Sequence, residues 1–377
     1  MSLSFFNYIY SIFINIKNYF ISDNKSNNNQ SFIWKNNYVD ARNIFRDYTL
    51  KKFKNYNKQF GEIYIDSFND LSVDYLFLNN NHSQNLHIII SGTHGVEGYC
   101  GSALQFKTLD YILQNNNFTQ NNSYLFIHAL NPYGYFHNRR FTKNNVDLNR
   151  NYLNAFFKDN YPQKIAQLIN TYVLSLTFIY LFFNILFNFG FTKAREYIVK
   201  GQYTYQKSLF YGGDKAEYNI DVLQQILDTI NYQQFKQIFI FDIHTGLGKY
   251  GNLSIMVNNH TFNKIKFKIY CNKTTKFIDI SNNNMYKNSI GSIVDGIYHY
   301  IKYKCYQGDI LPIILEYGTY SNLQIFFGLL FENYYFWNNN PKKLINSQNY
   351  LKKLFYVDKN DWKNLVSYNY ENFIKQI

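Results

Sequence analysis

Four short hydrophobic runs mark the expected strands of this chain. Each run is apolar at nearly every position, which is typical of strands that are buried on both faces of a sheet. The runs are Leu86 to Ile90, Tyr124 to Leu130, Gln237 to Ile243 and Ile310 to Leu315. Longer helical stretches separate them. This alternation predicts an α/β fold with a mixed, mostly parallel central sheet that is covered by helices on both faces.

Another apolar run, Leu3 to Ile21, opens the chain and is followed by the polar stretch Ser22 to Gln30, which is typical of a linker. We therefore expect residues 1–34 to form an apolar extension with a linker, and residues 35–377 to form one domain. The run lacks a basic start and a small-residue cleavage site, which argues against a secretory signal. It also fits an amphipathic helix on a membrane surface, so membrane contact through residues 3–21 stays an open alternative.

Charge and cysteine content narrow the range of partners. The net charge of +13 among 377 residues invites a nucleic-acid partner. The lysines are scattered, however, and groups such as Lys264, Lys266 and Lys268 are typical of solvated faces, so we expect no nucleic-acid binding. The cysteines are Cys100, Cys271 and Cys305. Their odd number and wide spacing argue against a disulfide framework and favour a cytoplasmic location.

A cluster of polar residues and glycines follows each expected strand. Ligands bind at the carboxyl ends of strands in open α/β sheets, so we expect the four clusters to converge on one site. The first cluster, Ser91 to Gly98, places His94 three residues before Glu97. This spacing lets an imidazole nitrogen and a carboxylate oxygen reach one zinc ion. A bare His-x-x-Glu pair is common, and its position after a buried strand gives it weight.

The third cluster, Asp242 to Gly248, supplies a second histidine, His244. Two histidines and one glutamate, with an open position for water, are a known ligand set of catalytic zinc. His128 competes for the role of ligand, but it falls inside the run Tyr124 to Leu130 and is interpreted as a core residue.

The second and fourth clusters add charged groups to the expected site. The second cluster runs from Asn131 to Asn151 and contains Arg139 and Arg140. Arginine binds a carboxylate through two parallel hydrogen bonds or neutralises a developing oxyanion. In the fourth cluster, Glu316 directly follows an apolar run. A glutamate at such a place can take a proton from zinc-bound water and return it to a leaving amine.

The uncharged run Tyr172 to Gly190 is nearly long enough to cross a bilayer. A single span there would place Glu97 and His244 on opposite sides of a membrane, where they could not bind one metal ion. We therefore expect this run to form a buried or surface-packed helix.

In this order, the motifs resemble those of the zinc carboxypeptidases of the carboxypeptidase A superfamily. They are His-x-x-Glu, Asn-Pro-x-Gly, an arginine, Val-Asp-Leu-Asn-Arg-Asn, a histidine after a strand and a glutamate after a later strand. The resemblance runs from about Tyr38 to the C-terminus, and the string at residues 146–151 is its most specific part. The wording Ser-Gly-Thr-His-Gly-Val-Glu-Gly and Asp-Ile-His-Thr-Gly-Leu-Gly resembles more closely a subgroup of unassigned function.

The resemblance implies a role for each matching residue. One zinc ion would be bound by His94, Glu97 and His244, and Glu316 would act as the general base. Arg140 would stabilise the oxyanion, and Asp147 would accept a hydrogen bond from His94. The substrate would be held by Asn149, by Arg150 and, on position alone, by Tyr298.

The implied activity is zinc-dependent hydrolysis of an amide bond near a carboxylate, in a peptide or an acyl-amino acid. The chain departs from the digestive carboxypeptidases at Val96, where they carry an arginine. The alternatives left open are an acyl-amino-acid deacylase and a catalytically silent binding module of the same fold. A cysteine hydrolase that uses Cys100 beside His94 is disfavoured, because the Gly-x-Ser-x-Gly type of nucleophile elbow is missing.

Overall fold

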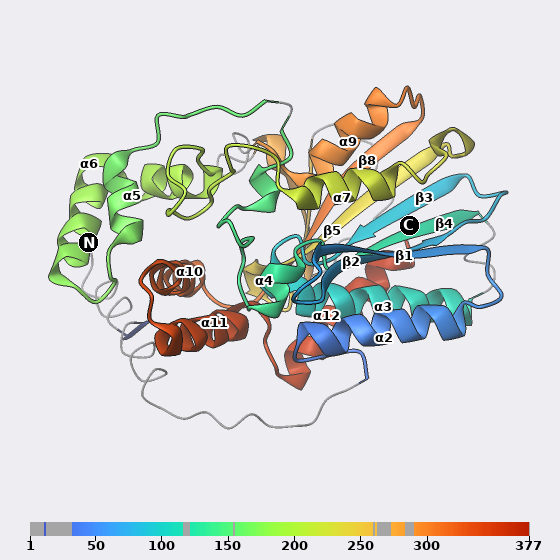
Figure 1. The fold of residues 1–377 in the computed structure, drawn as a ribbon, viewed down its shortest axis with the longest axis horizontal. Coiled ribbons are helices and arrows are strands. Elements are labelled where there is room, and N and C mark those ends of the chain that lie inside the picture. The colour runs from blue at the N-terminus through green and yellow to red at the C-terminus, as the bar shows by residue number, and fades with distance from the viewer. Residues whose placement is uncertain are drawn as a thin grey trace.

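A mixed eight-stranded sheet lies at the centre of the described part of the chain (Figure 1). The computed structural model describes residues 11–12, 32–115, 121–153, 155–258, 261, 273–282 and 290–376. The strands are β1 (Lys58–Asp66), β2 (Leu71–Leu78), β3 (Asn85–Ile90), β4 (Asn122–His128), β5 (Gln237–Tyr250), β6 (Leu253–Val257), β7 (Thr275–Asp279) and β8 (Asp309–Gly318). Their order across the sheet is β1-β2-β4-β3-β5-β8-β6-β7.

The four hydrophobic runs form the four neighbouring strands β4, β3, β5 and β8, which are all parallel to one another. Antiparallel pairing joins β1 to β2, β2 to β4 and β6 to β8, whereas β6 and β7 are parallel. The predicted α/β class with a mixed sheet is therefore confirmed. All four carboxyl ends of the central strands lie at one edge of the sheet, where their following loops can meet.

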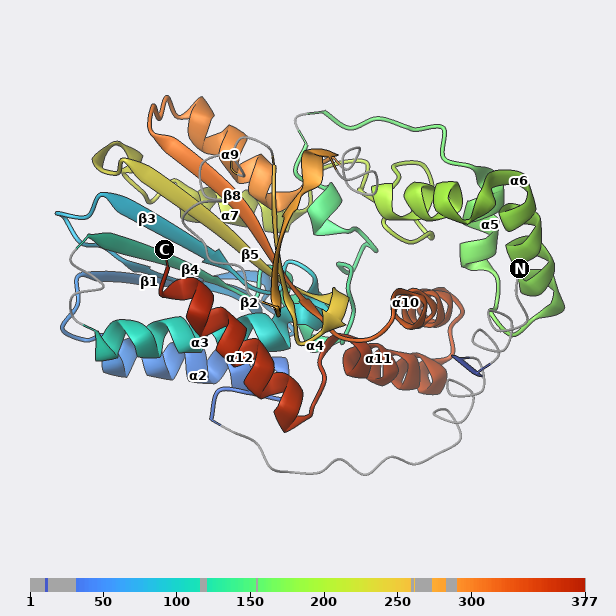
Figure 2. The same cartoon turned by 180° about the vertical axis from the view of Figure 1, so that it is seen from behind.

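Helices cover both faces of the sheet, as predicted. Figure 2 shows α2 (Tyr38–Lys52), α3 (Gly98–Gln114) and α12 (Asn360–Ile374) on one face. On the other face lie α7 (Tyr218–Leu227) and α9 (Ile293–Tyr303). Each layer has its own apolar core, which includes Phe106 and Phe373 on the first side and Leu223 and Ile297 on the second. Removal of these side chains from water is the main stabilising contribution of the layers.

A third group of helices lies beyond the carboxyl ends of the central strands (Figure 1). It comprises α5 (Gln163–Asn170), α6 (Leu176–Lys200), α10 (Asn322–Trp337) and α11 (Pro341–Phe355), which share a third apolar cluster. The short helix α4 (Pro132–Phe136) and four 3-10 turns complete the described elements. These turns are η1 (Gly95–Glu97), η3 (Leu148–Arg150), η4 (Tyr232–Gln234) and η5 (Ile280–Asn282).

Helix α6 contains most of the long uncharged run Tyr172 to Gly190. The Ser175 side chain caps its first turn by accepting a hydrogen bond from the backbone of Phe178 at 3.0 Å. The helix bends by 103° around Gly190, whose φ of +71° is readily adopted only by glycine. Ile185 is buried, whereas Phe187 is 91% exposed, so the helix packs on the surface of the domain.

Membrane-spanning potential is confined to this bent helix within the described ranges. No single helix there has the length and hydropathy to cross a bilayer, although Leu176–Gly190 and Thr192–Lys200 together meet the criteria of length and composition. The expected extension of residues 1–34 lies outside the described residues except at 11–12 and 32–34, and Cys271 lies outside them too.

Candidate metal centre and active site

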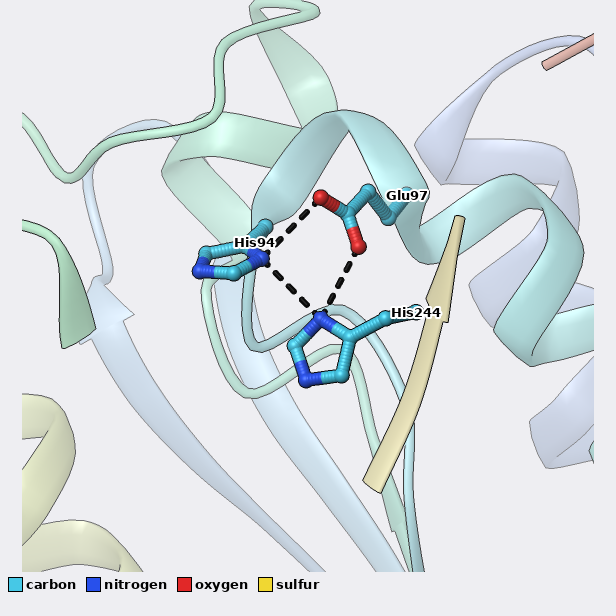
Figure 3. A group of neighbouring side chains, drawn as sticks. All are labelled: His94, Glu97 and His244. Carbon is cyan, nitrogen blue, oxygen red and sulfur yellow. Dashed lines mark hydrogen bonds and ion pairs between the residues drawn. The ribbon is translucent and has the colours of Figure 1, made fainter. Parts of the chain in front are cut away.

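His94, Glu97 and His244 converge at the carboxyl ends of β3 and β5 (Figure 3). His94 follows the end of β3, Glu97 lies in η1, and His244 lies within β5. The Nδ1 atom of His94 is 3.0 Å from Glu97 Oε1, and the Nδ1 atom of His244 is 2.9 Å from Glu97 Oε2. The two Nδ1 atoms are 3.0 Å apart. All three side chains are buried.

Each imidazole has a carboxylate on its outer nitrogen. His94 Nε2 lies 3.0 Å from Asp147 Oδ1, and His244 Nε2 lies 2.7 Å from Asp242 Oδ2. Asp242 in turn accepts a hydrogen bond of 2.8 Å from the Thr93 hydroxyl. Such carboxylates fix the tautomer and orientation of metal-binding histidines. The role of Asp147 was expected, but that of Asp242 was missed, although its place two residues before His244 puts both on one face of the strand.

The ligand atoms of this cluster are arranged as a metal ion requires. When each outer Nε2–H donates to its carboxylate, both Nδ1 lone pairs point toward the oxygens of Glu97. Three acceptors then face one point, an arrangement that is unfavourable without a positive charge between them. The three ligand atoms lie within 4.8 Å of one another. Two histidines and one carboxylate are a ligand set that zinc takes in catalytic sites.

The charges around the cluster shift the pKa values of its members. Burial alone would raise the pKa of Glu97, but the charge of His94 and hydrogen bonds with both histidines lower it below its ordinary value. Burial disfavours a charged His244, yet the charge and hydrogen bond of Asp242, with those of Glu97, raise its pKa well above its ordinary value. Without a cation, the centre therefore holds a proton on His244.

Arg140 and Arg139 occupy different environments. Arg140 donates from Nε to Asp147 at 3.1 Å and from Nη1 to Glu97 at 3.2 Å, so its guanidinium borders the centre. Arg139 points away from it and forms a buried ion pair with Glu332 of α10 at 2.6 Å. Its guanidinium also packs over the ring of Phe336 at 3.3 Å. Arg139 thus anchors its own loop, which also contains Arg140, to α10.

Glu316 lies in β8 directly opposite His244 of β5 in the parallel register. Its Oε1 atom accepts a hydrogen bond of 2.8 Å from the backbone of Leu247. Burial and the neighbouring charge of Glu97 raise the pKa of Glu316 to about 8, although the charge of His244 opposes this shift. A carboxyl group with such a pKa can exchange a proton near neutral pH.

Backbone hydrogen bonds join the segment between His94 and Glu97 to the segment that contains Arg139 and Arg140. The amide of Gly95 donates to the carbonyl of Arg140 at 3.2 Å, and the amide of Val96 donates to that of Arg139 at 2.7 Å. A Cβ atom on Gly95 would lie 2.0 Å from the backbone of Gly134. Only glycine allows this approach, which accounts for the glycine within the His-x-x-Glu motif.

Two of the three expected substrate-binding residues line the cavity beside the metal centre. Asn149 and Arg150 line the cavity beside the centre, but Tyr298 is absent from the described lining and packs in α9 against the core under that helix. The Arg150 guanidinium donates to the carbonyls of Asn149, Val199 and Lys200 at 2.7–3.0 Å. Arg150 therefore holds the end of α6 in this structure.

The cavity beside the centre has a volume of about 330 Å³. Its lining includes His94, His244, Glu316 and Arg140 of the centre, together with many apolar side chains of α6 and α10. Its volume falls in the range of about 300–1,000 Å³ that is typical of small-molecule sites.

Cys100, the alternative nucleophile, and His128, the alternative metal ligand, both lie in the core. The Cys100 thiol is fully buried among apolar side chains, and burial, with the charges of Glu97 and Glu316, raises its pKa well above the ordinary value. A thiol held in its protonated form is a poor nucleophile. His128 is fully buried, stacks on Phe45 at 4.5 Å and contacts Gln105 Oε1 at 3.1 Å. Its interpretation as a core residue agrees with these contacts.

Comparison with known proteins gives one family match. A family described as "Protein of unknown function (DUF2817)" matches residues 34–369. A search of curated proteins finds no match.

Several solved structures are similar to the chain. Carboxypeptidase A from Helicoverpa armigera is 14% identical, with a TM-score of 0.47 and coverage of 94% of this chain and 82% of that chain. Bovine thrombin-activatable fibrinolysis inhibitor, solved in complex with tick carboxypeptidase inhibitor, is 12% identical, with a TM-score of 0.46 and coverage of 86% and 99%. An aspartoacylase family protein from Mesorhizobium loti is 13% identical, with a TM-score of 0.34 and coverage of 66% and 56%.

Proposed function

The chain belongs to the family described as "Protein of unknown function (DUF2817)", and we propose that it is a zinc-dependent hydrolase that cleaves an amide bond near a substrate carboxylate. One observation carries this proposal. Two imidazoles and one carboxylate, each buried, direct their acceptor atoms at a single point beside a cavity that also contains a carboxyl group and an arginine. This combination supplies the groups that metal-assisted hydrolysis requires.

His94, Glu97 and His244 would hold the zinc ion, and Asp147 and Asp242 would orient the two imidazoles. When bound, the ion would polarise the scissile carbonyl and make a water molecule acidic near neutral pH. These requirements explain why both outer nitrogens are tied to carboxylates, since each inner nitrogen must present a lone pair.

Glu316 would act as the proton carrier. It lies across from His244 in the sheet, where its carboxylate could accept a proton from water and pass it to the leaving amine. Arg140 would stabilise the developing oxyanion. Its Nε and Nη1 atoms are engaged with Asp147 and Glu97, which fixes the guanidinium and leaves Nη2 for the substrate.

The proposal is tested with purified protein and the variant Glu316→Gln. We expect about one equivalent of zinc in both proteins by elemental analysis, because Glu316 is not among the proposed ligands. A panel of peptides, γ-glutamyl peptides and N-acyl amino acids should reveal chelator-sensitive activity in the wild type. The variant should lose at least about a hundredfold in kcat, the lower range for a missing general base. Undiminished activity in the variant would remove Glu316 from the mechanism.

A catalytically silent binding module is the second candidate, since the fold alone does not require turnover. The complete set of ligands and the proton carrier weigh against it. Stoichiometric zinc without turnover of any substrate in the panel would favour this candidate. A protein without bound zinc, even after incubation with an excess of the metal, would contradict the hydrolase and favour the silent module, which need not hold the metal.

A further inference from the structure

Helix α6 lines the candidate active site with both of its halves. Before the bend at Gly190, Phe182, Ile185 and Leu186 line the cavity, and after it Ile198 does so. The 103° bend allows one helix to contribute two walls. None of these four side chains carries a polar group, so this side of the cavity is mostly apolar, with Arg195 as its charged member.

Helix α10 forms the opposing wall. Leu323, Phe326 and Leu329 line the same cavity, and these residues belong to or pack against the apolar cluster that α10 shares with α6. A chamber bounded in this way by two mostly apolar helix faces accepts an apolar group and disfavours polar ones, because few groups in these walls would replace their water. His94 and Glu316 line the same cavity as these apolar side chains.

The lining of the cavity also includes a positively charged side chain. Arg195 of α6 is part of the lining, and within the described ranges it has no hydrogen-bond or ion-pair partner. Arg150, the other arginine near the end of α6, is engaged with backbone carbonyls. An anionic group of the substrate can therefore pair with Arg195 while an apolar group fills the chamber.

We propose that the substrate is an N-acyl amino acid with a long acyl chain, which lies between α6 and α10 while its carboxylate pairs with Arg195. This inference rests on the proposed amide hydrolysis and specifies its substrate. Hydrolysis adds one water across the amide bond and releases a fatty acid and a free amino acid, so no oxidant or further reactant is required. A short acyl group would leave the chamber unfilled.

The test compares acetyl, octanoyl and dodecanoyl derivatives of one amino acid. We expect kcat/KM to rise by up to about fourfold for each added methylene until the chamber is full, which is the gain from burying one such group. Leu186→Trp fills part of the chamber and should lower kcat/KM for the dodecanoyl substrate by at least about tenfold, with less than about threefold change for the acetyl substrate. Equal activity on all three chains would overturn the inference.

A neighbouring residue provides the matched control. Phe187 is 91% exposed and does not line the cavity, so Phe187→Trp should preserve the chain-length profile. If Leu186→Trp lowers activity on all chains equally, the chamber does not hold the acyl group.

Binding separates this inference from the proposed hydrolysis. Glu316→Gln should bind N-dodecanoylglycine at least about a hundredfold more tightly than N-acetylglycine in calorimetry, whether or not the wild type shows turnover. Preferential binding without turnover in the wild type would support the chamber and contradict the hydrolase. Chelator-sensitive cleavage of short substrates, with equal binding of both ligands, would support the hydrolase and contradict the chamber.

Discussion

Removal of the charge on Asp242 tests whether this carboxylate strengthens metal binding by His244. Asp242 Oδ2 accepts from His244 Nε2 at 2.7 Å, and Oδ1 accepts from the Thr93 hydroxyl at 2.8 Å. In Asp242→Asn, the amide oxygen can still face His244 while the amide nitrogen donates to Thr93, because a hydroxyl can also accept. The variant therefore keeps the hydrogen bond and loses only the negative charge behind the imidazole.

The expected loss of metal affinity follows from this difference. A hydrogen bond to a charged group contributes about 1.5–3 kcal/mol, and a neutral one about 0.5–1.5 kcal/mol. The difference of about 1–1.5 kcal/mol corresponds to a roughly tenfold weaker affinity in Asp242→Asn. Asp242→Ala loses the whole bond and should weaken zinc binding by about 10–150-fold, which agrees with the range for such supporting carboxylates.

Competition with a chromophoric chelator measures these affinities, and circular dichroism checks that each variant is folded. Thr93→Val is the control, because it removes the other partner of Asp242 and leaves the bond to His244; its zinc affinity should stay within about threefold of the wild type. If folded Asp242→Asn and Asp242→Ala both bind zinc as tightly as the wild type, His244 does not depend on this carboxylate and the assignment of the centre is wrong.

Two further predictions concern pH and the arginines of the cavity. The raised pKa values of Glu316, about 8, and of His244 mean that the folded protein without metal binds these protons more tightly than the unfolded chain. Their stabilisation is complete below the ordinary values and is lost as pH rises through the raised ones. Buried His87 and His128, whose pKa values are lowered to about 4, act in the opposite sense and raise stability up to about pH 6.5, so the test is a comparison of two proteins. In chelator, the unfolding free energy of the wild type should fall relative to that of Glu316→Gln between pH 5 and 8, by up to about 1.4 kcal/mol per unit in denaturant titrations. A wild type whose unfolding free energy does not fall relative to that of Glu316→Gln over this interval would contradict the shift assigned to Glu316. Arg150→Ala should lower the unfolding free energy by about 1–3 kcal/mol, because the carbonyls of Val199 and Lys200 at the end of α6 lose the hydrogen bonds from the guanidinium. Arg195→Ala should change it by less than about 0.5 kcal/mol and raise KM for substrates with a carboxylate; the reverse pattern would reassign the anion site to Arg150.

The central strands could be predicted because burial on both faces leaves a continuous apolar run. The outer strands gave no comparable signal. β1 is half exposed along its length and contains lysine, glutamine and glutamate, so its sequence resembles that of a loop. β2 is buried throughout and forms a local hairpin with β1, but its antiparallel pairing with β4 joins residues that are far apart in the sequence, such as Asp74 and His128. Pairing partners of this kind follow from the whole fold and not from local pattern.

In the site, too, residues marked by local sequence pattern could be predicted, whereas contacts between distant segments could not. The positions of His94, Glu97 and His244 could be anticipated, because each follows one of the continuous apolar runs at a short spacing. The partner of Arg150 could not, since the carbonyls of Val199 and Lys200 approach it only through the path of α6. Tyr298 was placed by sequence position alone, and the packing of α9 puts it away from the cavity lining.

The pairing of His244 with Glu316 across β5 and β8 has a consequence for how this family can diversify. The spacing between these two groups is set by the backbone ladder of the sheet, in which a shift by one residue would turn the side chains to the opposite face. Helices α5 and α6 lie outside that ladder, so insertions and substitutions there can reshape the chamber without moving the reacting groups. Relatives with very different helices at this position should therefore share one chemistry and differ in the molecules on which they act.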